Sequence, residues 1–353
     1  MRTLLAAIAL LSLAGCVGDA QRGGTTVLTY GSPYGPGHPF SRADIQWMKW
    51  IEKESGGRLR IQPYWSGSLL SSEHSLIELR HGVADIGLIT PIYARGGAHL
   101  QRTQAGFYAG LKTYVEQTRL YRCLVAAEPQ FDRELHDLKV LAVQGGNLPG
   151  LVTRDRPVRT LEDLQGLRLR APSELLAVLK DLGADPVDMP MGEVYSALAK
   201  GVLDGVVAPA DTLKSLHFAE VAQYFTEMEI PRGAYAARAM GIRRWNALEP
   251  WQRELLLRGV AVWENALATE LIAADRAGYD LGREQGITLL DMPADERARF
   301  EKIYVRDGES RARSLSRFDI DGLTTFQLAR TLAPRIAAGE IPDCAKDHNE
   351  PTS

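Results

Sequence analysis

Residues 166–209 constrain the fold more than any other stretch of this chain, because a strand, two helices and a second strand follow one another there. Residues 167–171 alternate apolar and charged side chains, as a strand with one buried face does. Ser173 is predicted to cap a helix whose leucines recur at helical spacing, and a shorter helix follows at 192–200. The apolar run 202–207 predicts the second strand. Such a crossover builds parallel sheets, so we expect an α/β fold.

Three segments carry motifs in a characteristic order. They read IELRHGVADIGLI, EDLQGLRLRAPS and LGADPVDMPMGEVYSALAKGVLDGVVAP. In residue type and spacing they resemble the DctP-type solute-binding proteins of TRAP (tripartite ATP-independent periplasmic) transporters, over roughly residues 26–300. The resemblance implies a two-lobed fold of the periplasmic-binding-protein type, with a long helix bracing both lobes. It also implies binding of a small organic acid, a mono- or dicarboxylate, and its delivery to the membrane permease subunits.

Arg170 closes the first strand of the crossover, where the family pairs an arginine with the carboxylate of its solute. A guanidinium holds a carboxylate through two parallel hydrogen bonds, which a lysine cannot copy. Ligands of open α/β sheets lie beyond the carboxyl ends of strands, and Arg170 stands at such an end. The alternative for Arg170 is a solvated charge at the end of a strand or half of a structural ion pair. Arg168, on the same face but further from the strand end, is expected to have a structural role.

Six further residues are candidates for contact with the solute. Thr90 and Tyr93 directly follow a predicted strand, 84–89, at the carboxyl edge of the sheet. Tyr34 lies in the Gly/Pro-rich loop 31–40, where an aromatic side chain can equally cover the core.

The remaining three candidates depend more on the resemblance. Glu73 matches a position from which family members reach the solute, although the helix dipole alone favours a glutamate in a first turn. Ala208 stands where the family carries an asparagine that supports the carboxylate. Tyr195 is predicted to form an apolar wall with Met189 and Met191, and all three could equally be core residues.

The chain departs from the family pattern in two places. No arginine occurs at 145–151, the neighbourhood in which members that bind large polyol acids carry a second one. The asparagine that supports the carboxylate is replaced by alanine, as described above. We therefore expect a less polar pocket, with one charge clamp and apolar walls.

The N-terminus reads as an export signal. A positively charged start and a short apolar run lead to Leu-Ala-Gly-Cys, which resembles the bacterial lipobox. We expect residues 1–16 to be a lipoprotein signal peptide, Cys16 to be lipidated and 17–26 to be a tether, with an ordinary secretory signal as the alternative. The mature protein is expected in the periplasm, anchored to a membrane by lipid.

The predicted elements divide the chain into two lobes. The expected boundaries are 27–147 with 234–275 for lobe I, 148–233 with 276–341 for lobe II, and a frayed tail at 342–353. One long helix is predicted over 248–285, with Gly259, Gly278 and Gly282 as points where it can bend.

Cys123 and Cys344 are the cysteines that remain after Cys16. They can pair in an oxidising compartment, but the sequence does not show whether the two side chains lie close together. Two independent thiols are favoured.

Several function classes find no support in the sequence. A net charge of −3 gives no indication of nucleic-acid binding. The chain lacks Gly-x-Ser-x-Gly, Gly-x-Gly-x-x-Gly, P-loop, His-Glu-x-x-His and Cys-x-x-Cys motifs, and its histidines lack the spacing of metal ligands. We therefore expect no enzyme activity, no cofactor and no metal. The alternative function is a periplasmic receptor that passes its closed state to a membrane signalling kinase.

Overall fold

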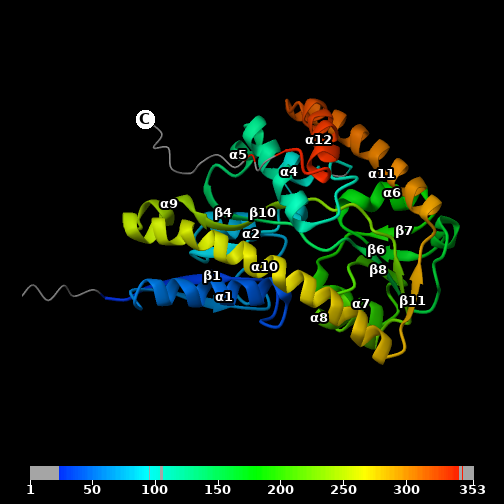
Figure 1. Cartoon of the computed structure of the whole chain (residues 1–353), viewed down its shortest axis with the longest axis horizontal. Helices are drawn as coiled ribbons and strands as arrows, with labels where there is room; N and C mark the ends of the chain where they lie inside the picture. The colour runs from blue at the N-terminus through cyan, green and yellow to red at the C-terminus, as the bar shows by residue number, and fades with distance from the viewer. Residues whose placement is uncertain (1–23, 95, 104–105, 342–343, 345–353) are drawn as a thin grey trace, which may run out of the picture.

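The computed structural model describes residues 24–94, 96–103, 106–341 and 344. The predicted signal peptide with Cys16, most of the tether and most of the tail lie outside the described residues. The described chain forms two sheets flanked by helices, one sheet in each lobe (Figure 1). The α/β, two-lobed architecture expected from the sequence is confirmed.

The sheet of lobe I has the strand order β2-β1-β3-β10-β4. Strands β1, β2 and β3 are parallel, whereas β10 runs antiparallel to both β3 and β4. Strand β10 therefore brings the chain back from lobe II into the middle of this sheet. The strand bounds are β1 Thr26–Gly31, β2 Leu59–Tyr64, β3 Ile86–Leu88, β4 Leu138–Gln144 and β10 Tyr235–Gly241.

The sheet of lobe II has the order β11-β9-β5-β8-β6-β7. Strand β6 is parallel to β7 and β8, so Arg170 lies opposite Val187 and Val206. The parallel crossover from β6 to β8 is confirmed, but an additional strand, β7, lies between its two helices, where the sequence predicted none. The bounds are β5 Gly150–Thr153, β6 Arg168–Arg170, β7 Asp185–Val187, β8 Gly205–Ala208, β9 Tyr224–Glu227 and β11 Thr288–Asp291.

The helix after β6 begins differently from the prediction. Ser173 makes no capping bond, because residues Ser173–Leu175 form a 3-10 turn, η3, and the α-helix starts only at Leu176. The Ser173 hydroxyl instead points across the lobe boundary to the carbonyl of Ile92, at 3.5 Å.

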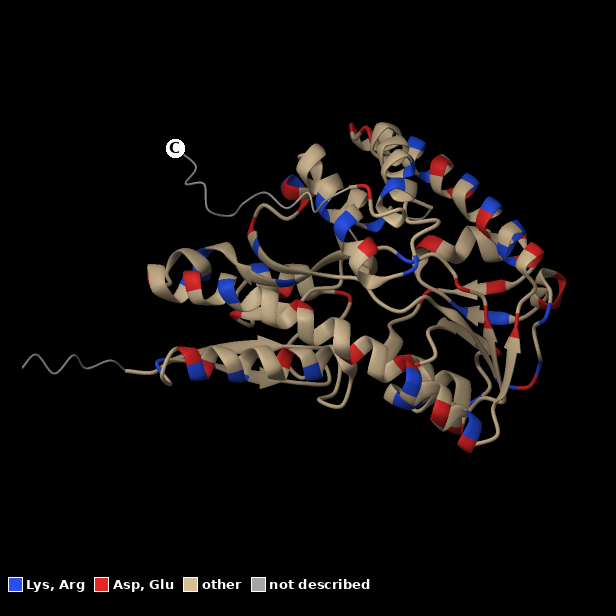
Figure 2. Cartoon of the chain, viewed as in Figure 1, with Lys and Arg blue, Asp and Glu red and all other residues tan. Residues whose placement is uncertain are grey.

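Helices cover both sheets. Lobe I carries α1 Pro39–Glu54, α2 Ser75–Arg80, α3 His99–Arg102, α4 Tyr114–Ala127, α5 Gln130–Glu134, α9 Ile242–Asn246 and the 3-10 helix η1 Pro91–Tyr93. Lobe II carries α6 Leu176–Asp181, α7 Val194–Ala199, α8 Thr212–Ser215, α11 Ala294–Ser314, and the 3-10 helices η2 Leu161–Leu164, η4 Met191–Glu193 and η5 Phe218–Glu220. Lys/Arg and Asp/Glu are interspersed along α11, as on a solvated helix (Figure 2). No helix in the described ranges combines the length and the apolar character needed to cross a bilayer.

Helix α10, Pro250–Glu284, braces both lobes. Its 35 residues correspond to about 52 Å at the α-helical rise, and it packs against α1 in lobe I and α8 in lobe II (Figure 1). The glycines at which the helix was predicted to bend lie inside one continuous helix, where they make packing contacts. A Cβ at Gly259 would lie 2.6 Å from Nε1 of Trp47, and one at Gly278 would lie 2.1 Å from the carbonyl oxygen of Ala210. These glycines let the helix approach both lobes closely.

The C-terminal helix α12, Gly322–Ala337, packs against α4, and its buried residues Phe326 and Ala329 join the core of lobe I. The expected boundary assigned 276–341 entirely to lobe II, so α12 is an exception to that assignment. The chain crosses back to lobe I after α11 through η6, Leu315–Phe318, because the apolar face of α12 packs against α4.

A disulfide joins Cys123 on α4 to Cys344, with a Cα–Cα distance of 4.7 Å and a sequence separation of 221 residues. The preference for two independent thiols was wrong. Because α12 docks on α4, the segment beyond it returns to Cys123.

A charged pair is buried in the core of lobe I. Arg238 on β10 donates to both carboxylate oxygens of Asp44 on α1, at 2.7 and 3.1 Å, and neither side chain is more than 1% exposed. Tyr30 and Trp263 donate to the same carboxylate at 2.6 and 2.7 Å. The pair therefore holds β10, α1, β1 and α10 together.

Asp44→Asn should lower the free energy of unfolding by about 3–5 kcal/mol, because it leaves the Arg238 charge buried without a counterion. Urea denaturation followed by circular dichroism measures the change. Asp280→Asn is the matched control, since Asp280 pairs with Arg283 on the solvated end of α10 and should show no measurable loss. Equal stability of the two variants would refute a structural role for the buried pair.

The double variant Cys123→Ser, Cys344→Ser should lose about 2–5 kcal/mol of stability, because the disulfide closes a very long loop in the unfolded chain. Melting temperatures with and without reductant test this. Reductant should destabilise the wild type and leave the double variant unchanged; a wild type indifferent to reductant would contradict the pairing.

Candidate functional site

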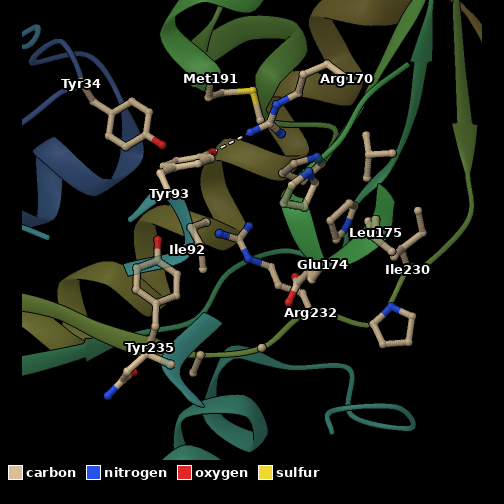
Figure 3. Close-up of a pocket in the computed structure, with 18 residues that line it drawn as sticks. Tyr34, Ile92, Tyr93, Arg170, Glu174, Leu175, Met191, Ile230, Arg232 and Tyr235 are labelled. Atoms are coloured by element: carbon tan, nitrogen blue, oxygen red, sulfur yellow. Dashed lines mark hydrogen bonds between the residues drawn. The ribbon is translucent and has the colours of Figure 1, made fainter. Parts of the chain in front are cut away.

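A cavity of about 100 Å³ lies between the lobes (Figure 3). Its walls come from the first loop and η1 of lobe I, from the end of β6 and η3 of lobe II, and from the two segments that connect the lobes, 145–149 and 228–234. The apolar part of the lining is Ile92, Pro149, Pro172, Leu175, Met191, Val207, Pro209, Ile230 and Pro231. The polar part is Tyr34, Tyr93, Gln101, Arg170, Glu174, Arg232 and Tyr235.

Arg170 lies at the carboxyl end of β6, with its side chain 2% exposed. Its Nε donates to the carbonyl of Met189 at 2.8 Å, and Nη2 donates to the Tyr93 hydroxyl at 2.6 Å. A guanidinium has five N–H donors, so, counting the acceptors among the described residues, three are left for a ligand. The Met189 carbonyl orients the planar group without neutralising its charge.

Tyr93 brings the two lobes into contact. It belongs to η1 of lobe I, whereas Arg170 belongs to lobe II, and the dashed line in Figure 3 marks the bond between them. Together with the contact between Ser173 and Ile92, this bond closes one side of the cavity.

Three phenols face the cavity, those of Tyr34, Tyr93 and Tyr235 (Figure 3). Burial raises the pKa of Tyr34 and of Tyr235 above the ordinary value, so both hydroxyls stay protonated and can donate hydrogen bonds. Tyr34 stacks on His38 at 4.1 Å between ring centres, and burial lowers the pKa of His38 to about 3. The imidazole is therefore neutral and adds no positive charge to the site.

Arg232 supplies a second guanidinium that the sequence analysis missed. Its Nη1 makes one long hydrogen bond, 3.5 Å, to the carbonyl of Asn147. Gly146 makes room for it, because a Cβ there would lie 2.6 Å from Nη1. The expectation of a single charge clamp was wrong, since the second arginine enters from 228–234 and not from 145–151. The available signal was the Pro-Arg-Gly turn immediately before an apolar strand.

Glu174 is the acidic member of the cavity wall, and it too was missed. Burial raises the pKa of Glu174 to about 7, against the opposing influence of the Arg311 and Arg232 guanidinium groups. Its carboxyl group therefore changes charge close to neutral pH.

Four of the predicted site residues are not in this cavity. Thr90 is buried, and its hydroxyl is engaged with Ser75 and the carbonyl of Ser72 inside lobe I. Ala208 points into the core because side chains alternate along β8, which leaves its neighbours Val207 and Pro209 to line the cavity.

The other two lie further away. Glu73 lines a neighbouring cavity of about 200 Å³, together with Asp188 and Met189. Tyr195 projects from α7 and donates a hydrogen bond to Glu220 at 2.9 Å. Tyr34, Tyr93 and Arg170 are thus the predicted residues that the fold brings together.

The described ranges contain no cluster of three or more His, Cys, Asp and Glu side chains that could hold a metal ion. The groups able to bind a ligand in the cavity are guanidinium, phenol and carboxyl groups with apolar surfaces between them. This set suits a small anion that also has an apolar part.

The chain is similar to known proteins in sequence and in fold. The profile of bacterial extracellular solute-binding proteins, family 7 (DctP), matches residues 31–306. A solute-binding protein of Albidiferax ferrireducens is 28% identical over 181 residues, 50% of this chain and 52% of that protein. This chain thus spans about half the length of the curated relatives it matches.

Solved structures share the fold over nearly the whole chain. A TRAP solute-binding protein of Rhodoferax ferrireducens in complex with copurified benzoate superposes with a TM-score of 0.81 at 24% identity, covering 90% of this chain and 100% of that one. A TRAP periplasmic solute-binding protein of Bordetella bronchiseptica with bound (R)- and (S)-mandelate gives 0.76 at 20% identity, over 88% and 99% of the two chains.

The raised pKa of Glu174 predicts a pH-dependent stability. Because the folded protein binds this proton more tightly than the unfolded chain, the contribution of Glu174 to stability decreases as the pH rises from its ordinary pKa of 4.5 through about 7. The decrease reaches up to about 3 kcal/mol. Glu174→Gln should therefore gain stability relative to wild type between about pH 5 and pH 8, measured by urea denaturation. A difference independent of pH would contradict the shift.

Proposed function

Because the chain belongs to the bacterial extracellular solute-binding proteins of family 7, the DctP-type receptors of TRAP transporters, we propose that it binds an organic acid between its two lobes and delivers it to a membrane permease. Members of this family are extracytoplasmic solute receptors and not enzymes. The lipid anchor at Cys16, a residue outside the described part of the chain, belongs to the same proposal, since it would confine the receptor near its membrane partner.

The observation that carries the proposal is the Arg170 guanidinium, which is buried, oriented by a backbone carbonyl and turned toward an interlobe cavity. In that setting a charge-assisted bond to a carboxylate contributes roughly 1.5–3 kcal/mol. Micromolar affinity requires about 8 kcal/mol. The apolar walls and the closure of the lobes must therefore supply the larger share.

Closure follows from contacts made to both lobes. A solute on Arg170 of lobe II would also touch Tyr34 and Tyr93 of lobe I, so it stabilises only the arrangement in which the lobes meet. The connecting segments 145–149 and 228–234 are the natural hinge, because they join the two sheets without belonging to either.

The cavity favours a compact solute. Its volume is about 100 Å³, below the volume on the order of 150 Å³ at which an apolar protein cavity accepts a benzene ring, so an acid with one small ring is the largest solute we expect. Ile92, Leu175 and Met191 provide apolar surface for such a ring. The benzoate and mandelate held by the two structural relatives are monocarboxylates with one such ring, and we extend that class to this chain.

Arg170→Lys should weaken binding of benzoate or a related acid about 10- to 100-fold and leave the fold intact, because lysine cannot form the two parallel bonds. Isothermal titration calorimetry measures the affinity. Arg168→Lys is the matched control: this neighbour on β6 has a side chain 52% exposed, lies 3.7 Å from Asp185, and should bind as the wild type does. Unchanged affinity in Arg170→Lys would remove this residue from the site.

A further inference from the structure

Glu174 and Arg232 are a charged couple on the cavity wall that the carboxylate clamp does not use. Figure 3 shows both side chains beside the cavity, and Arg232 is close enough to lower the pKa of the Glu174 carboxyl against the effect of burial. Glu174 comes from η3 of lobe II and Arg232 from the 228–234 connection, so the two charged groups reach the cavity from different segments.

Both groups have unused hydrogen-bonding capacity. Among the described residues, no group donates a hydrogen bond to the Glu174 carboxyl, and the one acceptor for Arg232 is the Asn147 carbonyl at 3.5 Å. A partly buried carboxyl and a guanidinium with so few partners are costly to enclose when the lobes close. A ligand that supplies the missing partners would remove that cost.

A hydroxyl group complements this couple, because it can accept a hydrogen bond from a guanidinium and donate one to a carboxylate at the same time. On the basis of the function proposed above, we propose that Glu174 and Arg232 form a second subsite that recognises a hydroxyl group, so that the preferred solute is a hydroxylated monocarboxylate. Its carboxylate binds Arg170, its apolar part lies between Ile92 and Met191, and its hydroxyl lies between Arg232 and Glu174.

The same geometry disfavours two other solute classes. A plain monocarboxylate would leave the couple unpaired inside a closed cavity, and sites built around a hydroxyl discriminate strongly against analogues that lack it. A dicarboxylate would place its second negative charge beside Glu174, which repels it whenever Glu174 is ionised.

Four groups face Glu174 from the elements around it: Arg232 from the connection, Arg311 and Tyr304 from α11, and Tyr108 from the segment before α4. Burial raises the pKa of both tyrosines above the ordinary value, whereas it raises the pKa of Glu174 to about 7, so the Glu174 carboxyl changes charge near neutral pH. Recognition of the hydroxyl by the carboxylate should therefore weaken as the pH falls through about 7.

Calorimetry with benzoate, 3-hydroxybenzoate, 4-hydroxybenzoate and isophthalate tests the proposal. At about pH 8 the wild type should bind at least one hydroxybenzoate about tenfold or more tighter than benzoate, and isophthalate more weakly than both. Glu174→Leu should abolish the preference, measured as the ratio of hydroxybenzoate to benzoate affinity within the same variant, and Glu174→Gln should reduce it, because a neutral amide is a weaker acceptor. In the wild type the preference should shrink between about pH 8 and pH 6, and in Glu174→Gln it should not.

Three results would overturn the inference: equal affinity for benzoate and both hydroxybenzoates, tighter binding of isophthalate, or a preference that survives in Glu174→Leu. In each of these cases benzoate or isophthalate still binds and Arg170→Lys still weakens it, so the proposed function stands. Absence of binding by every acid tested, with Arg170→Lys behaving as wild type, would instead reject the proposed function and the inference with it.

Discussion

The pairing of Arg238 with Asp44 in a water-free core is the interaction on which the rest of the structure depends. Two charges removed from water are stable only when their remaining hydrogen bonds are made. Here Tyr30 and Trp263 donate the further hydrogen bonds that the Asp44 carboxylate needs. Arg238 lies on β10, the strand by which the chain returns from lobe II to lobe I. Trp263 lies on α10, the helix by which the chain passes from lobe I to lobe II. One cluster of hydrogen bonds therefore fixes two of the passages between the lobes, β10 and α10.

The same cluster reaches the wall of the cavity. Arg238 donates to the side-chain oxygen of Gln144, and the amide nitrogen of Gln144 donates to the Tyr235 hydroxyl at 2.8 Å. Tyr235 faces the cavity and keeps its own hydroxyl proton for a ligand. The position of a cavity phenol is thus set by the core of lobe I, which gives the site a rigid side against which lobe II can close.

Charge at the site comes from segments that are distant in sequence and adjacent in space. Arg170 ends a strand of lobe II, Arg232 lies in a connection between the sheets, and Glu174 lies in the turn after β6. The connections 145–149 and 228–234 run side by side, so either can bring a side chain to the same place, and glycine in one makes room for arginine in the other. Two guanidinium groups and one carboxyl group therefore line the cavity together.

The sequence by itself determined what depends on short-range order: the crossover around β6, the long helix α10, and an arginine at the end of a strand. Hydrophobic periodicity and the residues that end helices and strands act over a few positions, so these three features can be recognised without knowing the fold. The tertiary structure alone decided that Ala208 faces the core, that α12 docks on lobe I, that Cys123 meets Cys344 across 221 residues, and that Arg232 and Glu174 share a cavity. Each of these outcomes depends on packing between segments far apart in the chain, and local propensity carries no information about such distances.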